Sequence, residues 1–256
     1  MATYIFRFFI FWYICGVVLV TFNLLPPWLE WANSVFLITA GIVAGIYFTE
    51  LYGKWQGVLY SLMIIVVSIY IEHLGVAYNF LFGSYDYTQN FGLKIADTPI
   101  TIGFAWLLII GCSHEIARVI SHGLPRLLHL LVFVFIGSLC AVTIDLILDP
   151  VSFKVKEYWI WEGPGVYYDI PFSNFMGWFL VAALFHLIFI LWHPVRKENT
   201  EVWSKRMALV FGLIIFMFIC IAFNGELYFS IILVSCLTVI WYGLYFWRNS
   251  YVSESS

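Results

Sequence analysis

The stretch TIDLILDPVSFKVKEYWIWEGPGVYYDIPFSNF, Thr143 to Phe175, separates two apolar runs in a chain of 256 residues of which only 11% are charged. A helix needs about 20 apolar residues to cross the roughly 30 Å hydrocarbon core of a bilayer, and both runs are of that length. Asp145 and Asp149 end the first run, and aromatic residues follow at once. The stretch therefore predicts an acidic and aromatic loop between two transmembrane helices.

The composition of the whole chain is that of a membrane protein. It is 63% hydrophobic and 21% aromatic with a mean hydropathy of +0.94, which leaves too little polar surface for a soluble domain or a disordered chain. The net charge of −3 disfavours nucleic acid as a partner. The five cysteines lie singly, without the spacing of a disulfide framework or a zinc site. We therefore expect an all-α integral protein of the cell membrane, surrounded by membrane lipids.

Eight apolar runs are long enough to cross the bilayer, where backbone polar groups must pair within helices. They lie near residues 4–25, 32–50, 55–73, 99–117, 126–148, 174–193, 205–223 and 226–247. The second and third runs are the least sharply separated, so a count of seven transmembrane helices stays open. Nine of the 12 Lys and Arg residues fall in loops on one side, and this bias predicts that both termini are cytoplasmic.

Two connections, 74–98 and 149–173, are longer than the others and are rich in aromatic residues, glycine and acids. A connection without a function is typically short and polar. Both fall on the extracytoplasmic side of the predicted topology. We therefore expect two long structured loops that carry a site, within a single polytopic membrane domain of residues 1–256.

Asp145 and Asp149 are four residues apart, which places both carboxyls on one face of a helix. Pro150 makes Asp149 the expected end of that helix. The negative end of the helix dipole, the neighbouring like charge and partial desolvation all favour the protonated form of at least one carboxyl. Such a group can serve as a general acid. The alternative is a solvated last turn whose acids are neutralised by Lys154 or Lys156.

Two further polar residues border the loops. Glu72, beside His73 at the end of the third run, is either a second acid/base group or a marker of the membrane surface. Asn174 opens the sixth run after Pro171, where it or Ser173 suits a helix N-cap, and capping is a sufficient explanation for it. Glu72 precedes one loop as the aspartates precede the other. The backbone N–H groups at the helix start near Asn174 point toward the same end of the helices.

The aromatic residues of the loops alternate with a period of two. In an extended chain Tyr85 and Tyr87 share one face, and the two tryptophans of YWIW share another. The turn signal EGPG then predicts a short hairpin. This hairpin would carry Trp159, Trp161, Tyr167 and Tyr168. Such rings bind a flat polyene or stabilise a cation, and an aromatic belt at the membrane surface is the alternative.

Other motifs either have a structural explanation or do not match the pattern of a metal site. The run HEIAR lacks the second histidine of a zinc protease, and its Glu115 and Arg118 are spaced for an intrahelical pair. The histidines do not form the dense clusters that membrane di-iron oxygenases need. They are His122, His129, His186 and His193. The sequence therefore predicts no metal site.

These motifs, in order, resemble those of the membrane-bound carotenoid biosynthesis protein family. The runs EHLGV…FGSYDYT, a following TP…W and DLILDPV…YWIWEGPGVYYDIPFSNFMGW carry the likeness, over roughly residues 70–180. The family includes carotenoid hydratases, multi-pass proteins that add water across a terminal double bond of an acyclic carotenoid. Leu81 departs from the proline that often precedes Phe-Gly in the first motif. The family's motifs fall on Glu72, Gly83, Tyr85, Tyr87, Asp145, Asp149, Pro150, Trp159, Trp161, Tyr168, Pro171, Asn174 and Trp178.

The resemblance implies a carotenoid substrate within the bilayer, and alkene chemistry implies the roles of the residues. Hydration needs an acid, stabilisation of a tertiary cation and a bound water, but no metal or other cofactor. We expect Asp145 or Asp149 to donate the proton, and the other aspartate or Glu72 to deprotonate the water. Association with other carotenoid enzymes is left open. The expected substrate-binding residues are Tyr85, Tyr87, Trp159, Trp161, Tyr168 and Asn174.

Two other functions stay open. An aspartate pair can hold magnesium and a diphosphate, as in a membrane prenyltransferase, although the chain has one such pair and few basic residues near it. A non-enzymatic carotenoid- or lipid-binding protein, or a transporter, would use the same aromatic loops without changing the pigment. Transporters are commonly built from inverted repeats and broken helices, which the sequence does not show.

Overall fold

A computed structural model describes residues 1–22, 24–29, 31–88, 93–95, 98–192, 196–197 and 200–254. These residues form eight long helices, each apolar enough to cross a membrane, so the prediction of an all-α membrane protein is confirmed. The helices are α1 (Ala2–Thr21), α2 (Trp31–Tyr52), α3 (Lys54–Tyr78), α4 (Ile100–Ser121), α5 (Arg126–Pro150), α6 (Phe172–Trp192), α7 (Glu201–Asn224) and α8 (Tyr228–Glu254). The short elements are η1 (Pro27–Leu29), β1 (Tyr85–Tyr87), β2 (Lys94–Ile95), β3 (Thr98–Pro99), η2 (Val151–Val155) and β4 (Trp159–Trp161).

Gly53 alone separates α2 from α3. Its φ is +94°, a backbone conformation that glycine adopts without the steric cost that a side chain would bring. Both flanking segments are apolar, which is why the sequence marks this boundary weakly. The second and third runs are therefore two helices, and the described residues hold eight helices of membrane-spanning length.

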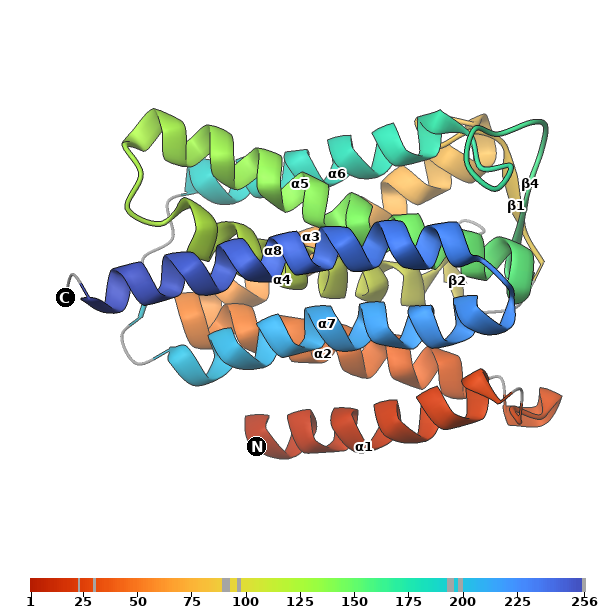
Figure 1. The fold of residues 1–256 in the computed structure, drawn as a ribbon, viewed down its shortest axis with the longest axis horizontal. Helices are drawn as coiled ribbons and strands as arrows, with labels where there is room; N and C mark the ends of the chain where they lie inside the picture. Colours follow the sequence, from red (N-terminus) through yellow and green to blue (C-terminus); the bar gives the residue numbers. More distant parts are fainter. Residues whose placement is uncertain are drawn as a thin grey trace.

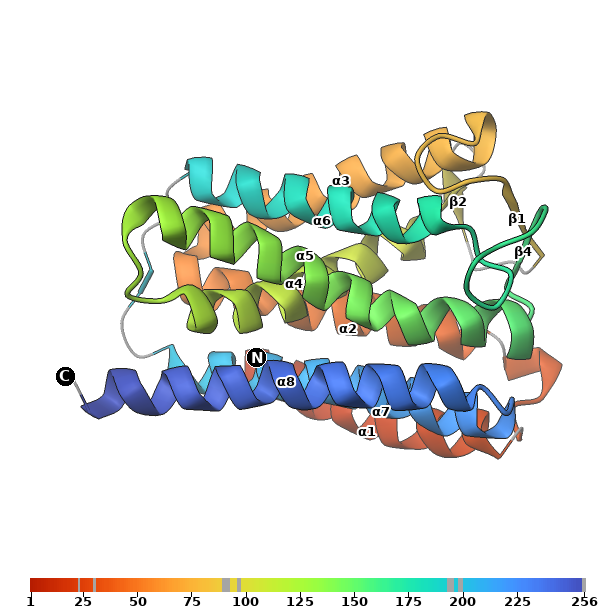
Figure 2. The same ribbon diagram turned by 45° about the horizontal axis from the view of Figure 1, so that its top comes forward.

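The central helix of the bundle is α4. It packs against α2, α3, α5, α7 and α8, and most of its side chains are buried. In contrast, α1 lies at the edge of the bundle, beside α2 and α7 (Figures 1 and 2). The strands β1 and β4 lie at one end, and both chain termini lie toward the other (Figure 1). The two long loops therefore meet at the end remote from the termini.

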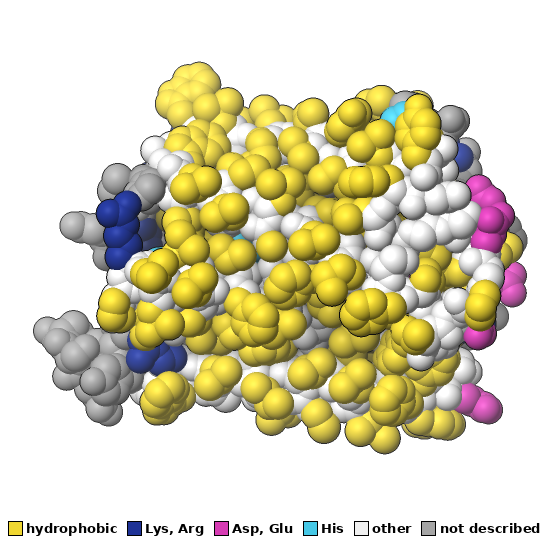
Figure 3. All heavy atoms as spheres, turned by 90° about the horizontal axis from the view of Figure 1, so that it is seen from above, with side chains coloured by type: hydrophobic (Ala, Val, Ile, Leu, Met, Phe, Trp, Pro, Cys, Tyr) yellow, Lys and Arg dark blue, Asp and Glu magenta, His cyan; other side chains and the backbone are white. Residues whose placement is uncertain are grey.

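Apolar side chains cover the flank of the bundle (Figure 3). In this view Lys and Arg gather mainly at the end that holds the termini, and Asp and Glu at the opposite end. Large exposed side chains such as Phe11, Val66 and Ile232 lie on the helices, as expected where lipid is the solvent. The chain is thus a multi-pass membrane protein, and the cytoplasmic position of its termini stays a prediction.

The helix α5 does not end at Asp149, as expected from the following proline. It continues through Pro150 into η2, one turn of π-helix. A proline has no N–H to donate to the carbonyl four residues earlier, which here is that of Leu146. The Leu146 oxygen accepts hydrogen bonds instead from the hydroxyls of Tyr167 (2.9 Å) and Ser230 (2.8 Å). These two contacts compensate for the missing helical bond, so the helix continues.

The expected hairpin within 149–173 does not form. The strand β4 pairs instead with β1 of the other loop, antiparallel, with Tyr85 opposite Trp161 and Tyr87 opposite Trp159. The predicted faces are present, because the ring centroids lie 4.9 Å apart in the first pair and 6.1 Å apart in the second. The EGPG turn leads to a tight turn bridged between residues 167 and 170. The two loops therefore form one structural unit.

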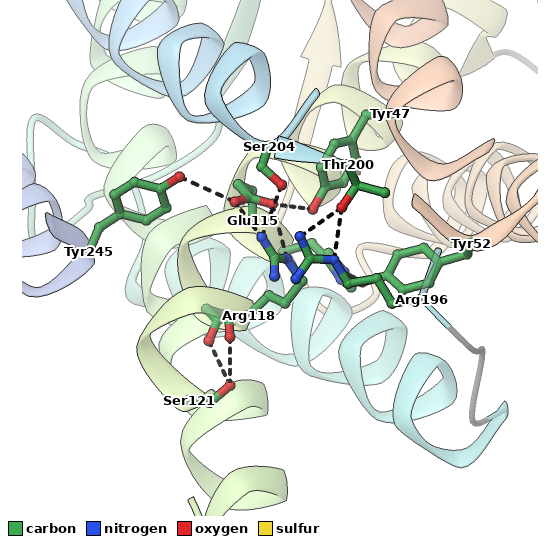
Figure 4. A network of polar contacts seen from close by, with 11 residues as sticks. Tyr47, Tyr52, Glu115, Arg118, Ser121, Arg196, Thr200, Ser204 and Tyr245 are labelled. Atoms are coloured by element: carbon green, nitrogen blue, oxygen red, sulfur yellow. Dashed lines mark hydrogen bonds and ion pairs between the residues drawn. The ribbon is translucent and has the colours of Figure 1, made fainter. Parts of the chain in front are cut away.

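A buried polar cluster lies at the C-terminal end of α4, away from the two loops (Figure 4). Glu115 and Arg118 form the predicted intrahelical pair, with 2.7 Å between Oε1 and Nη2. The hydroxyls of Tyr47 and Tyr245 donate to the same carboxylate, and Arg118 also donates to the Ser204 hydroxyl. The cluster therefore joins α2, α4, α7 and α8 through one carboxylate and one guanidinium.

Candidate functional site

Three carboxyl groups converge next to the paired strands. Glu72 comes from α3, and Asp145 and Asp149 come from α5. All three are buried, and all three line one cavity. Ionisable side chains inside membrane-spanning helices are costly to bury, and such residues commonly mark functional sites. The structure thus brings together the three acids that were expected from the sequence.

Asp149 accepts hydrogen bonds from three N–H donors. The indole nitrogens of Trp159 and Trp161 lie 2.6 Å and 3.4 Å from its Oδ1. The amide nitrogen of Asn174 lies 2.6 Å from its Oδ2. Donors of this kind stabilise the ionised form of a carboxyl. The strand β4 therefore both covers Asp149 and supplies two of its hydrogen-bond donors.

Asn174 bridges the two aspartates. Its amide nitrogen also lies 2.9 Å from Asp145 Oδ2, so each of its hydrogens has a carboxyl acceptor. The helix α6 begins at Phe172, which places Asn174 and Ser173 inside the helix rather than at its N-cap. The Ser173 hydroxyl donates to the carbonyl of Phe82. Capping therefore does not account for Asn174, and that expectation is wrong.

Asp145 has one oxygen without a hydrogen-bond partner among the residues that the structure describes. This atom, Oδ1, is buried, and Asp145 lines the cavity. A buried polar atom left without a partner costs about 1–3 kcal/mol. Such atoms normally find a partner, which here would be a molecule in the cavity. Asp145 is thus the one of the three acids that has an unpartnered oxygen among the described residues, and it lines the cavity.

Glu72 receives a donor on each oxygen. The Tyr85 hydroxyl lies 2.5 Å from Oε2, and the Trp106 indole nitrogen lies 3.0 Å from Oε1. Burial first, and then the charge of Glu72, raise the pKa of Tyr85 and of Tyr87 well above the ordinary value for tyrosine. Both phenols are therefore neutral at physiological pH and can donate hydrogen bonds.

The loop lysines do not neutralise the aspartates. Lys154 Nζ lies 2.7 Å from Asp169 Oδ2 in an exposed pair, and Lys156 Nζ lies 3.4 Å from the carbonyl oxygen of Val20. Burial lowers the pKa of Lys156. The solvated turn considered as an alternative is thus contradicted, because both aspartates are buried and the ion pairs of the described chain do not include them.

A cavity of about 440 Å³ extends from the acids. Its walls are mainly apolar and come from α1, α2, α4 and α7 as well as from the site elements. All but one of the expected site residues line it. The exception is Tyr168, whose hydroxyl accepts a hydrogen bond from the backbone N–H of Ser230 at 3.3 Å. The structure therefore places Tyr168 at a contact between the loop and α8, not in the cavity wall.

Most of the remaining wall residues were not expected to be site residues, and three aromatic ones among them are Phe82, Trp106 and Trp178. The rings of the two tryptophans lie 4.6 Å apart. Phe82 fits between α3 and α6 because both helices have glycine there, and a Cβ at Gly75 or Gly177 would lie 2.9 Å or 2.7 Å from its ring. The TP…W segment was a signal for Trp106, but the sequence has no local signal for the position of Phe82.

The centre combines a carboxyl with a free oxygen, two carboxyls held by N–H and O–H donors, and aromatic faces. Within the described ranges, which exclude His193, no three His, Cys, Asp or Glu side chains are grouped so as to hold a metal ion. Groups of the kind present can transfer a proton and stabilise a cation beside an apolar ligand.

Comparison with known proteins gives a family. The curated proteins and the solved structures yield no match to this chain. The family of carotenoid biosynthesis proteins matches residues 32–242, a range that includes all three acids, both paired strands and Asn174. Because this match spans most of the chain, the protein belongs to the carotenoid biosynthesis protein family.

Proposed function

We propose that the protein is a carotenoid hydratase, which adds water across a terminal double bond of an acyclic carotenoid. The observation that carries this proposal is that three carboxyls and several aromatic rings meet in the wall of a mainly apolar cavity. Membership of the family supports a role in carotenoid biosynthesis. A hydrocarbon end group has no polar atom that the protein could bind. An apolar pocket with an acid in its wall therefore suits the recognition and protonation of such a group.

Asp145 is the proposed proton donor. It receives one N–H donor where Asp149 receives three, and such donors favour the ionised form, so the proton belongs on Asp145. Its Oδ1 has no hydrogen-bond partner among the described residues, which leaves this atom available to carry the proton. The O–H bond of Asp145 breaks, and the alkene π electrons form a C–H bond at the less substituted carbon. A tertiary cation and the Asp145 carboxylate remain.

The cation is then captured by water. Each aromatic ring beside it contributes about 0.5–2 kcal/mol through the ring quadrupole. Every tenfold increase in rate requires the activation free energy to fall by about 1.4 kcal/mol. The carboxylates therefore supply the larger share of the stabilisation of the cation. The water oxygen bonds to the cationic carbon, and one water proton passes to Asp149 or Glu72. Transfer of that proton to Asp145 completes the cycle and leaves a tertiary alcohol.

The alternatives are less well supported. A prenyl diphosphate would meet three carboxyls and a single lysine, Lys156, among the described lining residues, and like charges repel. Activity that depends on magnesium would nonetheless favour prenyl transfer. A protein that only binds carotenoid would use the same cavity, but it would have no need of a buried acid with a free oxygen.

The deciding experiment is production of the protein in a host that makes acyclic carotenoids, followed by mass spectrometry of the pigments. A hydratase gives a product heavier by one water, and labelled water places its oxygen in that product. Unchanged pigments with short, intermediate and long carotenoid backbones would overturn the proposal. Pigment that copurifies with the protein but stays unchanged would favour the binding protein.

The site loops are proposed to face the extracytoplasmic side of the cell membrane, with both termini in the cytoplasm. The bias of Lys and Arg between the two sets of loops supports this topology. In intact cells, a membrane-impermeant thiol reagent should label Asp86→Cys and Val166→Cys but not Lys205→Cys. The reverse pattern would invert the topology.

A further inference from the structure

The cavity reaches from the acids to α1, the helix at the edge of the bundle. Six residues of α1 line it, and they recur at intervals of four, so they occupy one face of the helix. They are Phe11, Trp12, Cys15, Gly16, Leu19 and Val20. One face of the second half of α1 is therefore a wall of the cavity.

The exposed part of the cavity wall lies on this helix. Among the lining residues in the described part of the chain, Phe11 and Cys15 are the two that are exposed. The Phe11 side chain is 62% exposed. Both residues lie within a segment apolar enough to cross a membrane. An opening at this wall therefore faces the acyl chains of the bilayer and not water.

The size of the cavity requires such an opening. Its volume of about 440 Å³ falls in the range of pockets that hold one compact ligand. This is enough for the end group of a carotenoid but not for the whole molecule. With the end group at the acids, the rest of the polyene must leave the protein at the opening beside α1.

The attachment of α1 is separate from the acid centre. Trp12 Nε1 donates to the carbonyl of Ala32 on α2 at 3.2 Å, and the Tyr13 hydroxyl donates to the carbonyl of Leu213 on α7 at 2.8 Å. The family match begins at residue 32, so α1 lies outside the part of the chain that defines the family. The wall at α1 thus lies outside the matched range in sequence, and neither of these two hydrogen bonds involves an acid of the site.

Gly16 lies on the lining face and has free space in front of it. A Cβ built at this position meets no heavy atom within 4 Å. A larger side chain there would enter the cavity without displacing its neighbours. Gly243 of α8 has equally open surroundings but does not line the cavity, which makes it a matched control.

We propose that the face of α1 at Gly16 is the portal through which the polyene passes from the acid centre into the bilayer, and that the absence of a side chain at Gly16 admits long chains. This inference rests on the proposed function in taking an acyclic carotenoid as the ligand. It assigns α1 a role in substrate selection that is separate from the chemistry at Asp145.

The first test compares a long and a short substrate. Gly16→Phe should reduce hydration of a long acyclic carotenoid by at least about tenfold. It should spare a sesquiterpene-length isoprenoid hydrocarbon with the same end group, because that molecule fits inside the cavity. Gly243→Phe should leave both reactions unchanged. Equal loss of both reactions in Gly16→Phe, or no loss of either, would overturn the portal.

The second test does not require turnover. Cys15 lines the opening, whereas Cys236 of α8 is exposed elsewhere, so the two thiols report on the portal and on the general surface. Bound carotenoid should slow modification of Cys15 by methylmercury several-fold and leave Cys236 unaffected, as read by peptide mass spectrometry. Equal rates with and without pigment would contradict the portal. Protection without any hydrated product would instead uphold the portal and overturn the hydratase.

Discussion

The indole nitrogen of Trp159 lies 2.6 Å from Asp149 Oδ1, so a strand in one loop directly holds a carboxyl of a membrane-spanning helix. We expect Trp159→Phe to keep the ring and lose this hydrogen bond. A hydrogen bond to a charged group contributes about 1.5–3 kcal/mol, so the hydration rate should fall by about tenfold or more. The measurement is kcat for carotenoid hydration in membranes. An unchanged kcat would mean that the bond does not position Asp149 for the reaction.

Asp145→Asn should abolish most of the activity. The amide keeps the shape of the side chain but cannot donate a carboxyl proton, and general acid catalysis contributes about 10²–10⁴-fold. Asp169→Asn is the matched control, because Asp169 pairs with Lys154 at the surface. Pigment analysis at equal protein levels in the membrane should show loss only in the first variant. Full activity of Asp145→Asn would remove Asp145 from the role of acid.

Glu72 and Tyr85 should behave as one unit. Their side chains are joined by a hydrogen bond of 2.5 Å, so removal of either partner disrupts the same contact. The loss in activity of the double variant Glu72→Gln/Tyr85→Phe should therefore be smaller than the sum of the single losses, with a coupling of about 0.5–3 kcal/mol. Additive losses in kcat/KM would show that the two groups act independently.

High pH should destabilise the loop unit. The pKa values of Tyr85 and Tyr87 in the folded protein are raised by burial and then by Glu72. Unfolding restores the ordinary tyrosine value of about 10. Stability is therefore unaffected by these groups below about pH 10 and falls as the pH rises through the raised values. Thermal unfolding in detergent across this range should show a shallower alkaline loss for Tyr85→Phe/Tyr87→Phe than for the wild type.

The Glu115 cluster at the C-terminal end of α4 should contribute to the stability of the fold and not to the reaction. Glu115→Gln leaves Arg118 without its carboxylate in a buried site, and breaking such a pair costs about 3–5 kcal/mol. Glu201→Gln breaks an exposed pair with Lys205 and should cost at most about 1 kcal/mol. Unfolding temperatures in detergent measure both effects. Equal shifts in the two variants would contradict a structural role for the Glu115 cluster.

Local sequence was enough to predict the apolar helices, apart from the boundary at Gly53, and to single out the three acids that the structure brings together. Apolar length identifies each helix without knowledge of its neighbours, because lipid is the same solvent for all of them. The spacing of Asp145 and Asp149 fixes their shared helical face, whatever the rest of the fold does. Glu72 was harder to interpret from the sequence, because its partners Tyr85 and Trp106 lie on other elements.

Contacts between distant segments were not predicted. The EGPG turn indicated a hairpin for Trp159 and Trp161, but β4 pairs with β1 from the other loop, and no local pattern encodes that choice. Asn174 likewise had a sufficient local explanation as a cap, yet its amide contacts both aspartates on α5. In each case a local preference was overridden by tertiary structure.

The proline that follows Asp149 has a mechanical consequence. It leaves the Leu146 carbonyl without a helical hydrogen bond. The hydroxyls of Tyr167 in the loop and Ser230 in α8 therefore both donate to the same turn of α5. That turn lies between Asp145 and Asp149. A residue of α8 is therefore hydrogen-bonded to the turn that separates the two carboxyls, although no described residue of α8 lines the cavity. The lipid-facing helix α8 thus supports the turn that carries the acid pair.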